Sequence, residues 1–134
     1  MDIFTVFDQA ESIKVYNSGN ILLFNADSET YNNIIAVWND TCANARNMPA
    51  YGVSLNSETL KAVKRGLWLE FCFGKVNICN DLPFENLLVE VRAEWTGFNL
   101  IRYESERGYD GRCFYFNLVN RDMSALYNLL TFVK

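Results

Sequence analysis

The stretch Leu67-Trp68-Leu69-Glu70-Phe71-Cys72-Phe73 alternates between two sets of side chains. One set holds the two leucines and the two phenylalanines, and the other holds Trp68, Glu70 and Cys72. Because successive side chains of a strand point to opposite faces, this period of two predicts a β-strand with one fully apolar face. Gly66 suits the left-handed position that ends a helix, and Gly74-Lys75 predicts the end of the strand.

The chain after this strand contains further strand patterns. Phe84–Trp95 fits either a helix begun by Pro83 or a strand, and we favour the strand because its valines suit a pleated surface. Thr96-Gly97 then leads into a strand over Phe98–Ser105, followed by a loop at Arg107–Gly111 and a strand over Arg112–Val119. The last helix is expected to begin within Asn120–Asp122.

The chain before the strand begins with a hairpin pattern. Two apolar runs, Ser12–Asn17 and Asn20–Asn25, flank the turn pair Ser18-Gly19. Apolar residues at helical spacing follow a cap at Asp27 or Ser28, and Met48-Pro49 is expected to end that helix. A shorter helix is predicted to be capped by Asn56, with Leu55 and Leu60 placed as a hydrophobic staple.

This order of elements predicts one α+β domain over residues 1–134. It combines an N-terminal hairpin and a C-terminal antiparallel meander with about three helices on one face of the sheet. Half of the 134 residues are hydrophobic, which provides enough material for one core. No linker rich in proline, glycine or serine divides the chain.

The net charge and the cysteines limit which partners, compartment and cofactors we expect for this chain. The net charge of −4 disfavours nucleic acids and anionic membrane surfaces, because both are bound mainly through lysine and arginine. The N-terminus lacks the basic and apolar regions of a signal peptide, so we expect a cytoplasmic protein. In that compartment the four cysteines would be reduced, and without close cysteine pairs we expect neither a metal nor another cofactor.

Few residues suit catalysis. The chain has no histidine, which removes the commonest general base. Glu90 and Glu94 would lie about 13 Å apart on a strand, with Arg92 between them to neutralise them. Glu70 could be partly buried beside Trp68 and Cys72, although pairing with an arginine of a neighbouring strand is the simpler expectation.

The segment from Arg102 to Phe116 holds the candidate binding residues. Arg107-Gly108-Tyr109 is similar to the start of the RNP1 motif of RNA-recognition domains, but Asp110 and Gly111 stand where that motif needs a small residue and an aromatic one. Tyrosine and arginine are enriched at protein–protein hot spots. We therefore predict a partner surface made of Arg102, Tyr103, Tyr109, Asp110, Arg112 and Tyr115.

The sheet itself offers a second candidate surface. If one face carries no helix, a partner or a second copy of the chain could cover its outward residues, namely Tyr16, Trp68, Glu70, Leu88 and Tyr115. The simpler expectation is a covered face.

The general profile resembles small acidic inhibitor or immunity-type proteins of bacteria and their mobile elements. That resemblance implies a compact α+β domain that binds one protein target and carries no catalytic residues. The leading hypothesis is therefore a non-enzymatic protein-binding module. The alternatives are a small-molecule binder with an aromatic pocket between sheet and helices, and an enzyme that uses Glu70 or Cys72.

Overall fold

The computed structural model describes residues 3–49 and 52–133, and within these ranges helices and strands are interleaved. Two short 3-10 helices come first, η1 (Ile3–Thr5) and η2 (Phe7–Gln9). The α-helices are α1 (Glu29–Thr41), α2 (Asn56–Ala62) and α3 (Ser124–Thr131). The strands are β1 (Ser12–Asn17), β2 (Asn20–Asn25), β3 (Arg46–Met48), β4 (Val53–Ser54), β5 (Leu67–Cys79), β6 (Leu82–Glu90), β7 (Gly97–Tyr103), β8 (Gly111–Arg112) and β9 (Phe114–Asn117).

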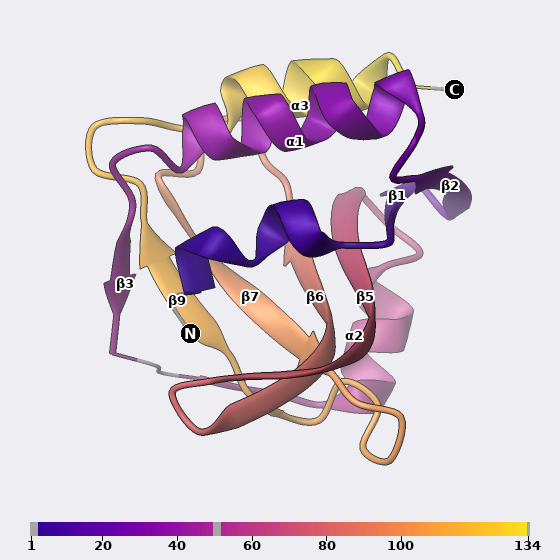
Figure 1. Ribbon diagram of the computed structural model, residues 1–134, viewed down its shortest axis with the longest axis vertical. Helices are drawn as coiled ribbons and strands as arrows, with labels where there is room; N and C mark the ends of the chain where they lie inside the picture. The colour runs from indigo at the N-terminus through magenta and orange to yellow at the C-terminus, as the bar shows by residue number, and fades with distance from the viewer. Residues whose placement is uncertain (1–2, 50–51, 134) are drawn as a thin grey trace.

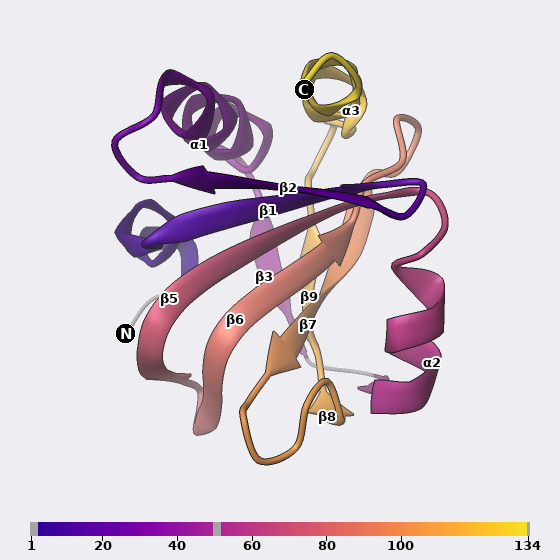
Figure 2. The same cartoon turned by 90° about the vertical axis from the view of Figure 1, so that its right-hand side faces the viewer.

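Seven strands form one antiparallel sheet in the order β2-β1-β5-β6-β7-β9-β3, and β4 and β8 form a small second sheet. Helices α1 and α3 lie side by side across one face (Figure 1). Helix α2 lies on the opposite side of the strongly curved sheet (Figure 2). The predicted α+β class with an antiparallel sheet is confirmed, but the helices cover both faces rather than one.

The N-terminal hairpin forms as its turn residues predict. Ser18 and Gly19 both have positive φ angles, 51° and 92°, which is the backbone of a tight two-residue turn between antiparallel strands. Gly66 also adopts the left-handed conformation expected of it, with φ 76°, and its carbonyl accepts a hydrogen bond from the Ser18 N–H at 2.8 Å. The start of β5 is therefore tied to the tip of the hairpin.

The first helix is shorter than its sequence pattern suggests. Ser28 caps it by accepting a hydrogen bond from the Tyr31 N–H at 3.1 Å, which confirms one of the two expected caps. The helix ends at Thr41 instead of reaching Met48-Pro49, and Arg46–Met48 pairs with β9 as a strand. Asparagines in this region are poor helix formers, so pairing with the sheet satisfies their backbone better than further helical turns.

The expectation that the strand ends at Gly74-Lys75 is wrong, because β5 continues past these residues. Its pairing with β6 shifts register between Cys72 and Asn77 and then continues to Cys79. Gly74 has φ 72°, a conformation that glycine adopts without the cost of a Cβ atom. The glycine thus accommodates an irregularity within one long strand.

The meander follows the predicted strands with changed ends. The strand interpretation of Phe84–Trp95 holds for β6 as far as Glu90, after which the chain turns and the Arg92 guanidinium lies 4.8 Å from the Trp95 ring centroid. The predicted strand Arg112–Val119 is divided into β8 and β9. Helix α3 begins at Ser124, just beyond the expected start, and Asp122 accepts a hydrogen bond from the Ser124 N–H.

Helix α2 begins where it was expected but by a different mechanism. Its first residue is Asn56, whose side-chain oxygen accepts from the Tyr109 N–H at 3.0 Å instead of capping the helix. Leu55 and Leu60 are both exposed, so the predicted hydrophobic staple is wrong. The helix is held by its contact with a distant loop rather than by local capping.

Aromatic side chains form the centre of the main core, between β5 and α1. The Trp38 ring lies 5.0 Å from the rings of Phe7 and Phe71 and 5.3 Å from that of Phe98, measured between centroids. Phe7 and Phe71 are themselves 4.8 Å apart. These tilted and edge-on pairs add to the free energy that burial alone contributes.

Replacing Phe71 by alanine should lower the free energy of unfolding by about 3–5 kcal/mol, because the change leaves a cavity among these rings. The matched control is Phe132→Ala, which deletes the same atoms from a side chain that is 81% exposed. Its effect should stay within about 0.5 kcal/mol. Urea unfolding followed by circular dichroism measures both, and equal losses would contradict this assignment of the core.

Candidate functional site

The sheet face opposite α1 and α3 is closed by α2 and by the loop between β7 and β8. Tyr16, Trp68, Leu88 and Tyr109 are buried there as a second, smaller core. An aromatic surface left open for a partner is therefore not what the chain builds at these positions. Tyr115 lies outside this cluster, on β9.

Glu70 is the polar centre of this second core, and its side chain has no exposed surface. The hydroxyls of Tyr16 and Tyr109 donate to its two carboxyl oxygens at 2.5 Å and 2.6 Å, and the Asn86 amide donates at 3.3 Å. Pairing with an arginine was the simpler expectation, and it is wrong. Two phenols and an amide satisfy the carboxylate, which a buried charge requires.

This arrangement also changes how the two tyrosines ionise. Burial raises the pKa of Tyr109 well above its ordinary value, and the neighbouring Glu70 carboxylate raises it further. The pKa of Tyr16 is raised by the same two causes in the same order. A phenolate beside a buried carboxylate would place two negative charges in a medium of low polarity, so both phenols stay protonated.

The cluster offers little for catalysis. Glu70 is enclosed, so a substrate has no route to its carboxylate without displacement of the loop that carries Tyr109. Burial raises the pKa of the Cys72 thiol to about 11, with a further rise from Glu70, so the reactive thiolate is scarce at neutral pH. These observations favour a structural role for both residues.

Two of the six predicted surface residues are buried. Arg102 is 4% exposed, and its guanidinium donates to the carbonyls of Arg112 at 2.7 Å and Pro83 at 2.6 Å while pairing with Glu104 at 3.6 Å. Tyr109 is 7% exposed because its ring packs against Tyr103 and its hydroxyl reaches Glu70. Both residues fix the shape of the loop from inside.

The other four lie in different places. Asp110 and Arg112 are exposed, and Asp110 accepts a hydrogen bond from the Asn56 N–H at 2.6 Å. Tyr103 and Tyr115 are half-buried. Tyr115 pairs with Asn99 and Met48 in the sheet, apart from the loop. The structure therefore brings Arg102, Tyr103, Tyr109, Asp110 and Arg112 together around the loop, with Tyr115 elsewhere.

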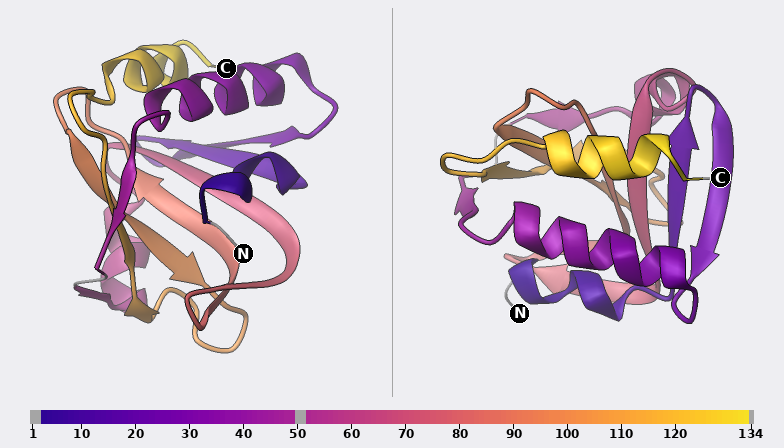
Figure 3. Two further views of the ribbon diagram at one scale, coloured as in Figure 1. Left: turned by 60° about the vertical axis from the view of Figure 1, so that its left-hand side comes forward. Right: turned by 90° about the horizontal axis from the view of Figure 1, so that it is seen from above.

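A different surface stands out at one edge of the large sheet. Strand β2 pairs with β1 along one side only, and in the described part of the chain no strand pairs with its outer side (Figure 3). Ile21 and Leu23 project from this strand with 60% and 58% of their surface exposed. The strand Asn20–Asn25 contains neither charge nor proline.

The opposite edge is built differently. Strand β3 is three residues long, carries the charged side chain of Arg46 and is followed by Pro49. Short length, charge and proline are the features by which native sheets prevent unwanted pairing at an edge. Of the two edges, only that of β2 lacks all three.

Sequence reasoning identified β2 as a strand but not as an exposed edge. Four consecutive apolar residues, Ile21–Phe24, are typical of a strand buried on both faces. Nothing in the sequence shows which neighbours its outer side has.

In comparisons with known proteins, no family model, curated protein or solved structure matches the chain. No helix in residues 3–49 and 52–133 is long and apolar enough to cross a membrane. The same residues contain no group of three or more histidine, cysteine or acidic side chains placed to hold a metal ion. The function of the chain therefore has to be inferred from its fold and its surface.

The Tyr109→Phe variant should unfold with about 1–3 kcal/mol less free energy at pH 7, because the buried Glu70 carboxylate loses a donor. The pH dependence should also change. The pKa values of Tyr16 and Tyr109 in the folded chain lie above the unfolded value of 10.0. The stability that these two groups contribute is therefore fully present below pH 10 and is lost as the pH rises above it.

This loss should be smaller in Tyr109→Phe than in the parent chain, because one of the two raised groups is gone. Urea unfolding at neutral and alkaline pH measures both effects. Tyr127→Phe, at an exposed position on α3, is the control and should match the parent chain. An identical alkaline loss in parent and Tyr109→Phe would contradict the role assigned to this tyrosine.

Proposed function

We propose that the chain is a non-enzymatic protein-binding module that receives an extended segment of its partner along β2. The observation that carries the proposal is the uncharged outer edge of β2, which pairs with no strand in residues 3–49 and 52–133, together with the exposed side chains of Ile21 and Leu23. An edge of this kind presents backbone N–H and C=O groups to any strand that approaches it. Adding a strand to such an edge is a recurring mode of peptide recognition.

The geometry of strand addition sets what the partner must provide. Backbone hydrogen bonds to β2 would supply affinity, and side chains at alternate positions would supply specificity. Ile21 and Leu23 lie on the same face of the strand, opposite Tyr16 and Lys14 of β1. The partner segment should therefore carry apolar side chains on that face, where they would bury these two residues.

Charge adds a second requirement. The chain has a net charge of −4, so a basic partner is attracted and a second acidic copy is repelled at long range. These properties favour the role of a small acidic inhibitor that captures one basic target. None of the four cysteines forms a disulfide, which is consistent with action in the reducing cytoplasm.

The decisive variant places a charge on the edge. Leu23→Lys puts an ammonium group where a partner strand would pack, so partner binding should be lost. The matched control is Ile78→Lys, because Ile78 has the same exposure of 58% and lies on β5 in the irregular hairpin with β6. Both variants should keep the stability of the parent chain within about 0.5 kcal/mol.

The measurement is capture of proteins from a lysate of the source organism by the parent chain and by each variant, eluted with a salt gradient. The captured protein is then mixed with the parent chain for hydrogen exchange read by mass spectrometry. We expect one basic protein that parent and Ile78→Lys retain and Leu23→Lys loses. Its binding should slow amide exchange in residues 20–25.

Two results would overturn this function. One is capture of the same partner by Leu23→Lys, or protection of amides elsewhere with none in residues 20–25. The other is a parent chain that is a dimer by light scattering while Leu23→Lys is a monomer. In that case a second copy occupies β2, and no separate target is needed.

A further inference from the structure

A pocket of about 350 Å³ opens beside the paired strands β3 and β9, next to the turn between β5 and β6. In Figure 1 this turn lies at the lower left, with β3 and β9 above it. The apolar part of the lining comes from Pro49, Leu82 and Phe114. The volume falls within the range that small-molecule sites occupy. Strand β3 is the edge of the sheet opposite to β2, so the pocket is separate from the proposed partner strand.

Two polar side chains share the face of the sheet on which this apolar lining lies. Arg112 and Phe114 both line the pocket, whereas Cys113 between them is buried and does not, which is the alternation of an extended chain. Asn47 pairs with Phe116, and side chains of directly opposed residues lie on the same face. Arg112 and Asn47 are both exposed, so a molecule in the pocket can reach their polar groups.

The Arg112 guanidinium lacks an acidic partner in the part of the chain that the structure describes. Arg92, Arg102 and Arg121 each form an ion pair with a carboxylate, but no such pair includes Arg112. None of the described residues that line the pocket is acidic. The pocket therefore combines an apolar wall with a cation whose charge is not balanced by a neighbouring side chain.

The buried side chain of Arg102 joins two walls of the pocket. Its guanidinium donates to the carbonyl of Arg112 at 2.7 Å and to that of Pro83, the neighbour of Leu82, at 2.6 Å. Only 4% of the Arg102 surface is exposed, so these contacts are held from inside the molecule. The walls are fixed before a ligand arrives, which lowers the entropic cost of binding.

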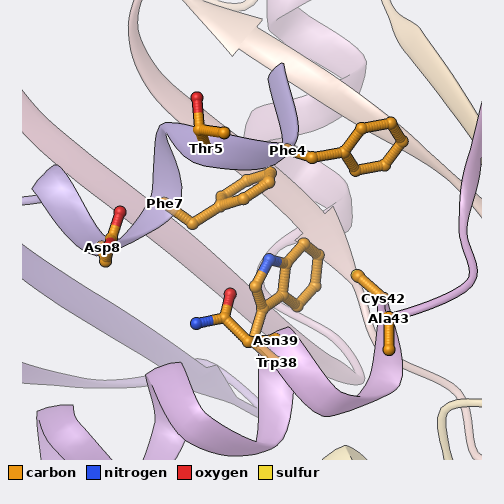
Figure 4. A pocket seen from close by; sticks show the side chains of 8 residues that line it. All are labelled: Phe4, Thr5, Phe7, Asp8, Trp38, Asn39, Cys42 and Ala43. Carbon is orange, nitrogen blue, oxygen red and sulfur yellow. The ribbon is translucent and has the colours of Figure 1, made fainter. Parts of the chain in front are cut away.

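A larger pocket of about 410 Å³, between the 3-10 helices and α1, has a different chemistry (Figure 4). Asp8 contributes a carboxylate to it, and none of its described lining residues is a lysine or arginine. The Trp38 side chain is fully buried, so its indole N–H is out of reach of a ligand. Of these two pockets, only the one at Arg112 offers an accessible cation.

From these observations we propose that the pocket beside β3 and β9 binds a small monocarboxylate with an apolar body. The carboxylate forms an ion pair with the Arg112 guanidinium, whose planar fork suits two parallel hydrogen bonds, and the Asn47 amide donates to the same group. The apolar body lies against Leu82 and Pro49. A phosphate monoester fits less well, because it brings nearly two negative charges to a single guanidinium.

Phenylacetate is the probe for this site, because it joins a carboxylate to an apolar ring. The readout is the assigned backbone amide spectrum of the nitrogen-15-labelled full chain. Phenylacetate should shift the signals of residues 47–48, 80–82 and 112–114 in a saturable manner, with a millimolar or tighter Kd. The signals of residues 20–25, on the proposed partner strand, should stay in place.

Three matched ligands test the chemistry. Phenylacetamide keeps the ring but has no charge, and it should bind at least about tenfold more weakly because the charge-assisted hydrogen bonds are lost. Acetate keeps the charge but has no apolar body, and it should also bind at least about tenfold more weakly. N-acetylphenylalanine carries the same groups as the carboxyl terminus of a peptide. Tighter binding than that of phenylacetate would assign the site to a peptide terminus, and weaker binding would assign it to a free acid.

Two matched variants test the location. Arg112→Gln removes the guanidinium but keeps the backbone carbonyl that accepts from Arg102, so the chain should unfold at the same urea concentration as the parent and lose phenylacetate binding. Arg112→Lys keeps the charge without the planar fork and should restore part of the affinity. The control is Arg107→Gln, which makes the same change in net charge at an exposed arginine outside the pocket and should bind phenylacetate as the parent does.

The proposal is overturned if phenylacetate produces no saturable shift in residues 47–48, 80–82 and 112–114. Equal binding of phenylacetate and phenylacetamide would show that the carboxylate is not recognised. Equal losses in Arg112→Gln and Arg107→Gln would mean that only the overall charge of the chain attracts the ligand. The binding of a partner to β2 enters none of these measurements, so the two proposals can fail separately.

Discussion

The burial of both faces of β5 is the constraint on which the rest of the structure depends. Its apolar face, with Leu69 and Phe71, requires α1 and α3, whereas the face that carries Trp68 and Glu70 requires α2 and the loop after β7. A buried carboxylate on the second face must be given donors, and Tyr16 and Tyr109 provide them from two separate elements. One central strand thereby determines where two distant segments of the chain are held.

The two-sided burial decides which surfaces remain for function. Residues that looked suited to binding, above all Arg102 and Tyr109, are used to close the second core and shape its loop. Exposed apolar side chains remain on β2, at Ile21 and Leu23, and also beside and on α2 and on the second half of β5. A protein of this size can cover both faces of a sheet but still has two edges, and only the edge at β3 is protected by length, charge and proline.

Tertiary packing also fixes Trp38 at the centre of the main core. Packing against three phenylalanines holds the indole in one orientation, and that orientation leaves its N–H without an acceptor in the described residues.

The sequence by itself determined the local elements: the period of two in Leu67–Phe73, the hairpin at Ser18-Gly19 and the Ser28 cap depend on neighbours a few residues apart. These patterns were sufficient for the α+β class. Only the tertiary structure decided that Glu70 meets two tyrosines, that Arg46–Met48 joins the sheet as a strand, and that β2 is an edge. The reason is physical, because pairing and burial join residues tens of positions apart, and the free energy of those contacts is set by spatial neighbours that a linear pattern does not specify.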